Sequence, residues 1–320
     1  MNIRAGIIGA AGYTGGEMLR ILLRHPQVDI AFAHSNSQGG KPVWLVHEDL
    51  EGETELHFSE TFHAREADVL FLCVGHGQAK TFLEENPVPD EVVVIDLSQD
   101  FRLDPSFVYG LPELNKAAIQ KSKRIANCGC FATAIQLALL PLAKEGLLQK
   151  EVHIHAITGS TGAGQGLSPT SHFSWRANNL QVYKAFEHQH LKEIRRSLEQ
   201  LQPGMVSPLN FIPVRGDFTR GILASVYTDC PLSEAELRDA YQSFYRDAPF
   251  TVVSSRNPNL KQVVNTNKCL LYIEKHGDKA FIVSAIDNLT KGASGQAVQN
   301  MNLVFGFDET SGLQLKPIGF

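Results

Sequence analysis

The chain has 320 residues, of which 43% are hydrophobic and 20% charged, and its formal net charge is -5. These proportions are typical of a soluble globular protein, and the length suggests about two domains. The acidic balance gives no basic footprint for nucleic acid, and no apolar run approaches the ~20 residues of a membrane-spanning helix. The cysteines are odd in number and form no C-x-x-C pair. This pattern argues against a disulfide framework or a zinc site and, with no signal peptide in view, favours the cytoplasm.

The N-terminal segment predicts a strand at Ile3 to Ile8, a glycine turn and an amphipathic helix at Glu17 to Arg24. Strand, turn and helix in this order are the context of a dinucleotide-binding fingerprint. Gly9 allows a tight turn, Gly12 allows a pyrophosphate to approach the backbone, and Gly15 allows close packing of helix on strand. The spacing is G-x-x-G-x-x-G, which differs from the usual G-x-G-x-x-G.

The second predicted strand, Val28 to Ala33, ends without the carboxylate that usually meets the ribose of NAD. Ser35, Ser37 and Lys41 follow it instead, and hydroxyls and an ammonium suit a phosphate better. The sequence therefore favours NADP(H) over NAD, the alternative being an ordinary polar loop.

Two further predicted strands, Ala67 to Val74 and Glu91 to Leu97, are apolar throughout, which indicates a parallel sheet covered on both faces. Ligands of such sheets bind beyond the carboxyl ends of the strands. Gly75 and Ser98 follow these ends, so we expect them to contact the cofactor. We expect His76 to line the same pocket rather than to act in catalysis.

The turn Asn127-Cys128-Gly129 precedes an apolar run from Phe131 that reads as a buried helix. Cys130 therefore falls at or next to the helix N-terminus, where unpaired N–H groups and the helix dipole favour an anion. A thiol in that position becomes a nucleophile near neutral pH. The alternative is a small buried hydrophobic residue.

The C-terminal half predicts an α+β domain. A strand at Val152 to Thr158 leads into a segment rich in glycine and hydroxyls, which can bind an anion. A loop with His172, Trp175 and Arg176 follows, and its composition favours a site loop over a linker. The further predicted elements are antiparallel strands, a helix among them and one more strand: Leu223 to Thr228, Thr251 to Ser254, Leu270 to Glu274, Glu234 to Tyr245, and Phe281 to Ile286.

His188 and His190 lie at the start of a predicted helix, Leu191 to Leu201. A histidine beside a thiol can shuttle protons, although a histidine at a helix start is also a common surface group. Arg215 and Arg220 are expected between strands, where arginine either clamps a carboxylate or phosphate or forms a surface ion pair.

We therefore predict an α/β protein with an N-terminal Rossmann NADP-binding domain and an α+β catalytic domain with a mixed or antiparallel sheet. The last helix, Gln296 to Val304, is expected to return to the first domain. The predicted boundaries are 1–129 plus 296–320 for the NADP-binding domain and 130–295 for the catalytic and oligomerisation domain.

These motifs together resemble the N-acyl-gamma-glutamyl-phosphate reductase family, over nearly the whole chain and in family order. The strings that carry the resemblance are GAAGYTG, SNS, NCGC followed by FAT, GSTGAG, HFSW, the H-x-H pair, RGI, and DNLTKGASGQAVQNMN. Aspartate-semialdehyde dehydrogenases share the fold and chemistry but match these strings less well. The chain departs from the family in Cys128, where proline is usual, and in a longer stretch between Arg215 and Arg220.

The resemblance implies a fold like that of semialdehyde dehydrogenases and glyceraldehyde-3-phosphate dehydrogenase. It implies that Cys130 is the nucleophile and that His190, or else His188, is the acid/base. It implies that the cofactor is held by Gly9, Gly12, Tyr13, Thr14, Gly15, Ser35 and Ser37, with Asn288 and Gly292 near the nicotinamide, and that Arg220 meets the substrate's carboxylate or phosphate. The other residues expected to bind are Gly75, Ser98 and Gly162 for the cofactor, and Asn127, Ser160 and Arg215 for the substrate.

The expected reaction is NADPH-dependent reduction of an N-acyl-gamma-glutamyl phosphate to the semialdehyde and phosphate through a cysteine thioester, in arginine biosynthesis. The acyl group, acetyl or succinyl, stays open. The expected assembly is a homodimer or homotetramer, with no nucleic-acid, membrane or metal partner. Two alternatives remain: an aspartate-semialdehyde dehydrogenase, and a non-catalytic NADP-binding regulatory protein.

Overall fold

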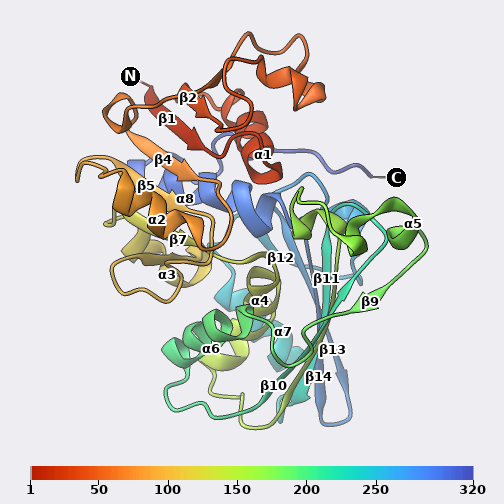
Figure 1. Ribbon diagram of the computed structural model, residues 1–320. Helices are drawn as coiled ribbons and strands as arrows, with labels where there is room; N and C mark the ends of the chain where they lie inside the picture. The colour runs from red at the N-terminus through yellow and green to blue at the C-terminus, as the bar shows by residue number, and fades with distance from the viewer. Residues whose placement is uncertain (1, 320) are drawn as a thin grey trace. The chain divides into compact units, whose positions relative to one another are not determined.

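The computed structural model describes residues 2–319, which divide into two compact units (Figure 1). Unit 1 comprises Met1–Gly129 and Ala293–Gln314, and unit 2 comprises Cys130–Gly292 and Leu315–Phe320. The first division follows Gly129, as the sequence analysis placed it. The return to unit 1 comes at Ala293 rather than at residue 296, and the last residues group with unit 2 rather than with unit 1.

Unit 1 is built on a parallel sheet of seven strands in the order β3-β2-β1-β4-β5-β7-β6. The predicted parallel sheet is therefore confirmed. β4 and β5 are fully buried, as their continuous apolar runs require. The strands are β1 Ile3–Ile8, β2 Val28–His34, β3 Phe58–Ser59, β4 Val69–Leu72, β5 Val93–Asp96, β6 Val108–Gly110 and β7 Arg124–Asn127.

The helices of unit 1 are α1 Tyr13–Leu22, α2 Gln78–Glu85, α3 Pro112–Ile119 and α8 Gly295–Phe305, with 3-10 turns η1 Val43–Leu45, η2 Glu48–Leu50 and η3 Ala64–Glu66. α1 begins at Tyr13 rather than at the predicted Glu17. Glycine has a low helix propensity, so the prediction left Gly15 and Gly16 outside the helix. The helix includes them because close packing at this point requires glycine. A Cβ on Gly15 would lie 2.5 Å from the Ala10 carbonyl oxygen.

Unit 2 is built on a mixed sheet of seven strands in the order β12-β13-β14-β11-β8-β10-β9. The strands are β8 Val152–Thr158, β9 Gln181–Val182, β10 Leu209–Arg215, β11 Ile222–Asp229, β12 Thr251–Val253, β13 Cys269–His276 and β14 Lys279–Ile286. The prediction was wrong in two places. β12 pairs with β13 in parallel, because the long connection that carries the 3-10 turn η6 Leu260–Gln262 returns the chain in the same direction. Arg215 ends a strand instead of lying between strands.

The helices of unit 2 are α4 Cys130–Lys144, α5 Phe173–Arg176, α6 His190–Leu201 and α7 Glu234–Phe244, with the turns η4 Ser160–Ala163 and η5 Pro169–Ser171. A π-helical turn, η7 Thr290–Ser294, precedes α8. α4 packs against α6, α7 and strands β8, β11, β13 and β14. Burial alternates along β8 and β11, so one face of the sheet is covered and the other is partly exposed.

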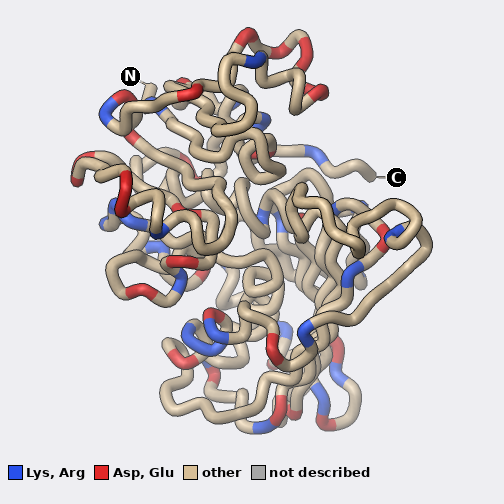
Figure 2. Tube along the Cα trace, viewed as in Figure 1, with Lys and Arg blue, Asp and Glu red and all other residues tan. Residues whose placement is uncertain are grey.

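Charged residues of both signs are interspersed along the chain in each unit (Figure 2). Among residues 2–319, none of the helices is both long enough and apolar enough to cross a membrane. Within the same range, the structure has no cluster of histidine, cysteine and carboxylate side chains that could hold a metal ion.

A proline inside α4 is compensated by two tyrosines. Pro141 has no N–H, so the carbonyl of Leu137, one turn earlier, has no donor from the helix backbone. The Tyr245 hydroxyl donates to that oxygen at 2.6 Å, and the Tyr241 hydroxyl donates to the neighbouring carbonyl of Ala138. Both tyrosines are buried. These bonds explain why α7 is fixed against α4.

Replacing Tyr245 with phenylalanine is expected to lower the free energy of unfolding by about 1–3 kcal/mol, because it leaves a buried carbonyl unsatisfied. Chemical denaturation measures the loss. In a Pro141→Ala background, the backbone N–H returns and the same substitution should cost clearly less. If Tyr245→Phe lowers the free energy of unfolding equally in both backgrounds, Tyr245 does not compensate for the N–H that Pro141 lacks.

Candidate active site

Cys130 is the first residue of α4, so the predicted position of the thiol at a helix start is confirmed. It is half-buried, whereas the other four cysteines are buried. Burial raises the pKa of the Cys73 thiol to about 12, which keeps that thiol protonated. Among residues 2–319, Cys130 is thus the most accessible thiol, and it stands where backbone N–H groups favour its anion.

The turn before Cys130 is fixed by a side-chain amide. Asn127, at the end of β7, is buried; its Nδ2 donates to the Ala293 carbonyl and its Oδ1 accepts from Asn300 Nδ2. Cys128, where the resembled family usually has proline, is buried and its Sγ donates to the Gly110 carbonyl at 3.4 Å. Asn127, predicted to bind substrate, has both ends of its amide engaged in this structure.

Gly292 lies directly against the nucleophile candidate. A Cβ at this position would be 2.9 Å from Cys130 Cβ and 3.2 Å from the Asp287 carbonyl oxygen. The Gly292 N–H donates to that same oxygen at 2.8 Å. Gly292 was predicted as a cofactor residue, and its place in unit 2 is set by this close approach to Cys130.

The two predicted histidines come together around Phe131, the residue after Cys130. The ring centroids of His188 and His190 are 4.6 Å apart, and they lie 5.5 and 6.4 Å from the centroid of Phe131. His188 Nδ1 accepts the N–H of His190 at 3.3 Å. The structure therefore places the H-x-H pair beside the start of α4.

The two histidines have different electrostatic surroundings. Burial lowers the pKa of His188 to about 4, and the charges of Lys184 and Arg215 act in the same direction. His188 is therefore neutral at pH 7. His190 Nε2 lies 3.8 Å from the buried Glu193 carboxylate, which stabilises a positive ring at this position.

Tyr183 and Arg215 complete this side of the site. The Arg215 guanidinium lies over the Tyr183 ring, 4.7 Å from its centroid, and the Tyr183 ring is 5.7 Å from that of His188. Burial is the main cause that raises the pKa of Tyr183 to about 12, and the nearby Cys130 thiol is the second. The phenol is thus a neutral hydrogen-bond donor close to the thiol.

Arg220 is engaged in an ion pair with a buried carboxylate. Its Nη2 and Nε lie 2.9 and 3.0 Å from the carboxylate of Asp287, which is fully buried. Asn288 Oδ1 accepts the N–H of Gly221, and its Nδ2 donates to Thr161 Oγ1. The loop of Arg220 is therefore tied to the segment that contacts Cys130.

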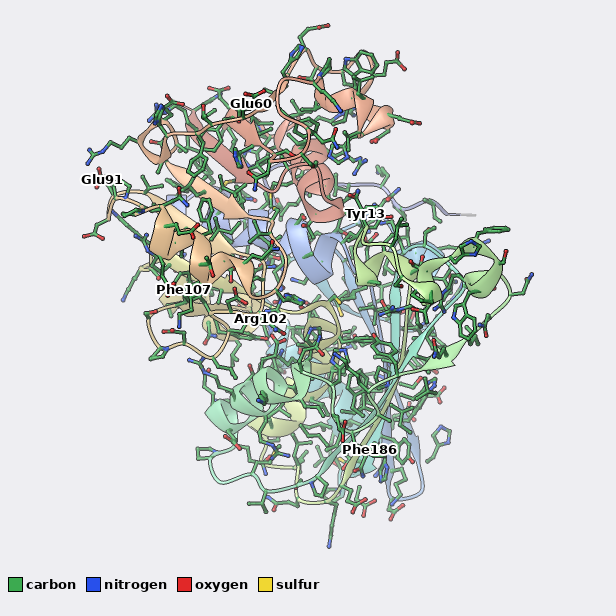
Figure 3. All side chains as sticks on the ribbon, viewed as in Figure 1. Tyr13, Glu60, Glu91, Arg102, Phe107 and Phe186 are labelled. Atoms are coloured by element: carbon green, nitrogen blue, oxygen red, sulfur yellow. The ribbon has the colours of Figure 1, made fainter. Side chains whose placement is uncertain are left out.

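In unit 1, the glycine turn follows β1 and opens α1, as predicted. Gly9 has a φ of +80°, and a Cβ there would lie 2.5 Å from the Cys73 carbonyl oxygen. Gly12 has space around it, and α1 starts without a side-chain cap. The first N–H groups of α1 at Tyr13, Thr14 and Gly15 therefore form an anion-binding end. Tyr13, labelled in Figure 3, is the first residue of α1. Its side chain is 38% exposed.

The loop after β2 places a carboxylate that the sequence analysis missed. Ser35 is buried and its N–H donates to the Ser59 carbonyl, while Ser37 is exposed. The Glu60 side chain lies over this loop, because a Cβ on Gly39 would be 2.3 Å from Glu60 Cγ. Glu60 follows β3, the strand beside β2, and only the strand pairing could have revealed its place.

The ends of β4 and β5 carry Gly75 and Ser98, as predicted. The Gly75 N–H bonds to Gln78 Oε1 at the start of α2. The Ser98 hydroxyl donates to the buried Asp96, and burial raises the pKa of that carboxyl to about 6. Ser98 is buried, so its hydroxyl mainly serves Asp96 in this structure.

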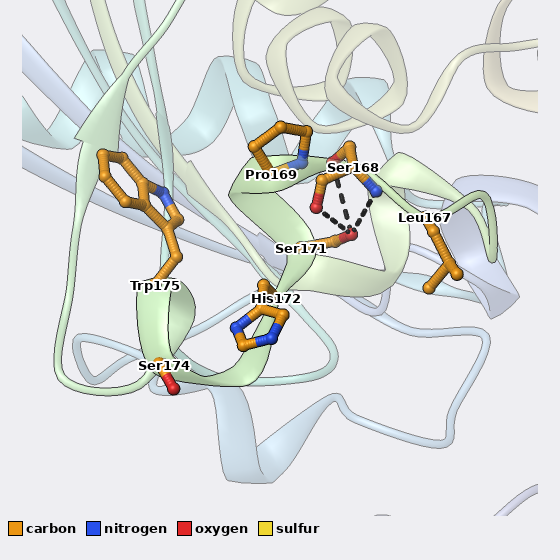
Figure 4. Close-up of a pocket in the computed structure, with 7 residues that line it drawn as sticks. All are labelled: Leu167, Ser168, Pro169, Ser171, His172, Ser174 and Trp175. Carbon is orange, nitrogen blue, oxygen red and sulfur yellow. Dashed lines mark hydrogen bonds between the residues drawn. The ribbon is translucent and has the colours of Figure 1, made fainter.

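The predicted site loop of unit 2 is largely exposed. Ser160 and Gly162 lie in η4, whose first N–H donates to the Phe218 carbonyl. A shallow hollow of about 680 Å³ follows. Figure 4 shows the residues that line it: Leu167, Ser168, Pro169, Ser171, His172, Ser174 and Trp175. Arg176 links the loop to the site, since its guanidinium donates to the carbonyls of Thr170 and Arg215.

The fold, with a glycine turn in unit 1 and a half-buried cysteine at a helix start in unit 2, places the chain among two-domain oxidoreductases. These have a dinucleotide-binding domain and a cysteine-bearing domain. The family model for "Semialdehyde dehydrogenase, NAD binding domain" matches residues 4–122. The model for "Semialdehyde dehydrogenase, dimerisation domain" matches residues 130–288.

Solved structures agree with this fold. An aspartate semialdehyde dehydrogenase II from Vibrio cholerae has a TM-score of 0.75 at 18% identity, covering 96% of this chain and 99% of that one. An aspartate semialdehyde dehydrogenase with NADP from Candida albicans has a TM-score of 0.69 at 13% identity, covering 95% of this chain and 99% of that one.

Curated relatives are more similar in sequence. An N-acetyl-gamma-glutamyl-phosphate reductase of Flavobacterium johnsoniae is 56% identical, covering 99% of this chain and all of the relative. One of Phocaeicola vulgatus is 54% identical with the same coverage. The chain belongs to the N-acetyl-gamma-glutamyl-phosphate reductase family, within the semialdehyde dehydrogenases.

The buried His188 predicts a pH dependence of stability. Its pKa is about 4 in the folded protein against an ordinary 6.5, so the unfolded chain binds the proton first as the pH falls. The free energy of unfolding is therefore highest above the ordinary value and should fall by about 2–3 kcal/mol between pH 6.5 and 4 on account of this residue.

Other buried histidines of lowered pKa act in the same direction, so the readout is the difference between wild type and His188→Asn. Denaturation curves across this pH range should show a shallower dependence in the variant. Parallel curves for the two proteins would contradict the assignment.

Proposed function

We propose that the protein reduces an N-acyl-gamma-glutamyl phosphate to the N-acyl-glutamate semialdehyde with NADPH, releasing phosphate, as a step of arginine biosynthesis. The observation that carries the proposal is Cys130 at the start of α4, with the histidine pair packed on the next residue, Phe131. Arg215 stands over Tyr183, whose ring packs against His188. The names of the curated relatives support the substrate. The acyl group is acetyl or succinyl.

The glycine turn of unit 1 suits the pyrophosphate of the cofactor. The N–H groups at the start of α1 would hold it, and the roomy backbone at Gly12 lets it approach. Ser35 and Ser37 are proposed to meet the 2′-phosphate of NADPH, with Gly75 and Ser98 at the neighbouring strand ends. Gly162, Asn288 and Gly292 are the proposed contacts from unit 2. When bound, NADPH supplies the hydride that reduces the acyl carbon.

The Cys130 thiolate attacks the gamma-acyl carbon, forms a carbon–sulfur bond and expels phosphate, which leaves a thioester. The N–H groups at the start of α4 are placed to stabilise the oxyanion of each tetrahedral species. The neutral Tyr183 phenol, beside the thiol, is a further donor for that charge.

We assign proton transfer to His190. It protonates the thiohemiacetal oxyanion and takes the proton back as the carbon–sulfur bond breaks, which releases aldehyde and thiolate. A group with a pKa of about 4 is a weak acid/base near pH 7, which argues against His188. The Glu193 carboxylate favours the charged form that His190 needs. His188 is then a support for the His190 backbone.

Between the two arginines, Arg215 is the better anion ligand. Arg220 is already paired with Asp287, so a substrate would have to compete with a buried carboxylate. Arg215 lies over the Tyr183 ring, which packs against His188, and its charge acts on His188. We propose that Arg215 binds the substrate's carboxylate or phosphate, with Ser160 and Asn127 as the further proposed substrate residues.

The test runs the reaction in reverse. Purified protein receives N-acetyl- or N-succinyl-glutamate semialdehyde, phosphate and NADP, and NADPH formation is followed by absorbance. Phosphate-dependent formation is expected, and the faster substrate names the acyl group. NADPH formation with aspartate semialdehyde alone would instead identify the protein as an aspartate-semialdehyde dehydrogenase. Silence with all three substrates would favour the non-catalytic NADP-binding alternative.

Cys130→Ala is expected to lower kcat by about 10⁴-fold or more, since the nucleophile is lost. Binding of NADPH, followed by its fluorescence, should remain. Cys230→Ala removes a buried thiol outside the site and serves as the matched control. Full activity in Cys130→Ala would sink the thioester mechanism.

We further propose that the protein is a cytoplasmic homodimer that pairs through the exposed face of the unit 2 sheet. Tyr227 and Val252 on that face are 41% and 44% exposed, and the matched family model is described as a dimerisation domain. None of the five cysteines forms a disulfide, which suits a reducing compartment.

Tyr227→Asp places a charge on that face, so it should raise the dimer dissociation constant by about tenfold or more. Sedimentation velocity at a series of concentrations measures the change. Glu236→Lys, on the exposed side of α7, provides a control that should keep the wild-type assembly. An unchanged dimer in Tyr227→Asp would place the interface elsewhere.

A further inference from the structure

A segment of unit 1 that no part of the proposed mechanism uses packs on the glycine turn. It comprises η1, η2 and the two residues between them, Val46 and His47, and it lies in the connection from β2 to β3. His47 is 5% exposed. Its Nε2 lies 2.9 Å from the Ala10 carbonyl oxygen, inside the turn that runs from Gly9 to Gly15. A carbonyl only accepts, so this nitrogen carries the proton.

The contact fixes a peptide that is already held on its other side. The N–H groups of Gly9 and Ala10 both donate to the His34 carbonyl at the end of β2, at 3.1 and 2.9 Å. His47 then holds the Ala10 carbonyl. The Ala10 residue is thus anchored at its nitrogen by β2 and at its oxygen by the imidazole, directly before the N–H groups of α1.

The imidazole also accounts for a glycine that the fingerprint does not require. A Cβ on Gly16 would lie 2.6 Å from His47 Cε1 and 2.7 Å from Nδ1. The ring therefore occupies the space of a side chain on the first turn of α1. Its outer side packs edge-on against Phe58, with the centroids 6.1 Å apart. The ring has little freedom to leave.

Charged pairs tie the same segment to α1. Arg20, on α1, forms a two-pronged ion pair with Asp49 of this segment. Just beyond the ends of α1 and of the segment, Arg24 pairs with Glu53 at 2.6 Å. Arg20 also bonds Glu17 at 2.9 Å. These pairs are partly exposed and contribute little stability singly, but they fix the segment's position on the helix.

The charged groups that face His47 are Arg20, Asp49 and Glu17. Burial is the main cause that lowers the pKa of His47, and Arg20 adds to the effect, whereas Asp49 and Glu17 oppose it. A neutral imidazole with its proton on Nε2 is thus the form that the surroundings favour at pH 7.

We propose that His47 is a positioning residue for NADPH: it holds the Ala10 carbonyl so that the N–H groups at the start of α1 stay aimed at the cofactor's phosphates. This inference rests on the proposed function. Without the imidazole, the turn must be ordered by the cofactor itself, and that ordering weakens binding. The step after binding is untouched, since His47 contacts neither thiol nor acid/base.

The test compares His47→Ala, His47→Asn and His47→Gln. The amide nitrogen of glutamine can reach the place of Nε2, whereas that of asparagine is too short. Alanine and asparagine should each raise the NADPH dissociation constant and KM about tenfold or more, with kcat at saturating NADPH within about twofold of wild type. Glutamine should restore most of the affinity.

His25→Ala is the matched control, because His25 is also 5% exposed in unit 1 but bonds Asn302 instead of the glycine turn. It should lose stability yet bind NADPH as wild type does. Equal NADPH affinity in His47→Asn and wild type, or an equal loss in His25→Ala, would overturn the inference while the proposed function stands. Wild-type protein that fails to bind NADPH would overturn both.

Discussion

The burial of α4 is the constraint on which the rest of unit 2 depends. Each side chain from Phe131 to Ala143 is buried, so the helix cannot shift or rotate without opening a cavity. Its first residue is thereby fixed as well. Phe131 then serves as the surface on which the two histidine rings pack. The packing of this one helix thus fixes the position of Cys130, the proposed nucleophile, and of His190, the proposed proton carrier.

Absent side chains shape both units in the same way. In unit 2, Gly292 allows the backbone to touch Cys130; in unit 1, Gly9 and Gly15 allow the turn to fold against β4 and α1. At each of these glycines, a single methyl group would displace backbone rather than a flexible side chain. The folding of both units and the placement of Cys130 therefore depend on positions where the lack of a side chain lets neighbouring groups approach closely.

The sequence predicted the features that repeat along the chain. β1 and β8 begin and end where their apolar patterns do, and the thiol and the H-x-H pair were found because each sits beside a strong helix pattern. Features that depend on pairing across the chain escaped it. The parallel pairing of β12, the strand at Arg215 and the Asp287 partner of Arg220 follow from tertiary packing. Tyr183, Glu60 and His47 lie in irregular segments, where no helix or strand periodicity predicts which way a side chain points.

The unequal burial of the five thiols has a practical side. Four of them are enclosed by the fold, whereas Cys130 is partly open. A soluble electrophile offered to the native enzyme should consequently react once per chain, at the site itself. The number of equivalents consumed then counts intact active sites in a preparation, independently of any substrate. For the same reason, mild oxidation should modify Cys130 and leave the four buried thiols unchanged.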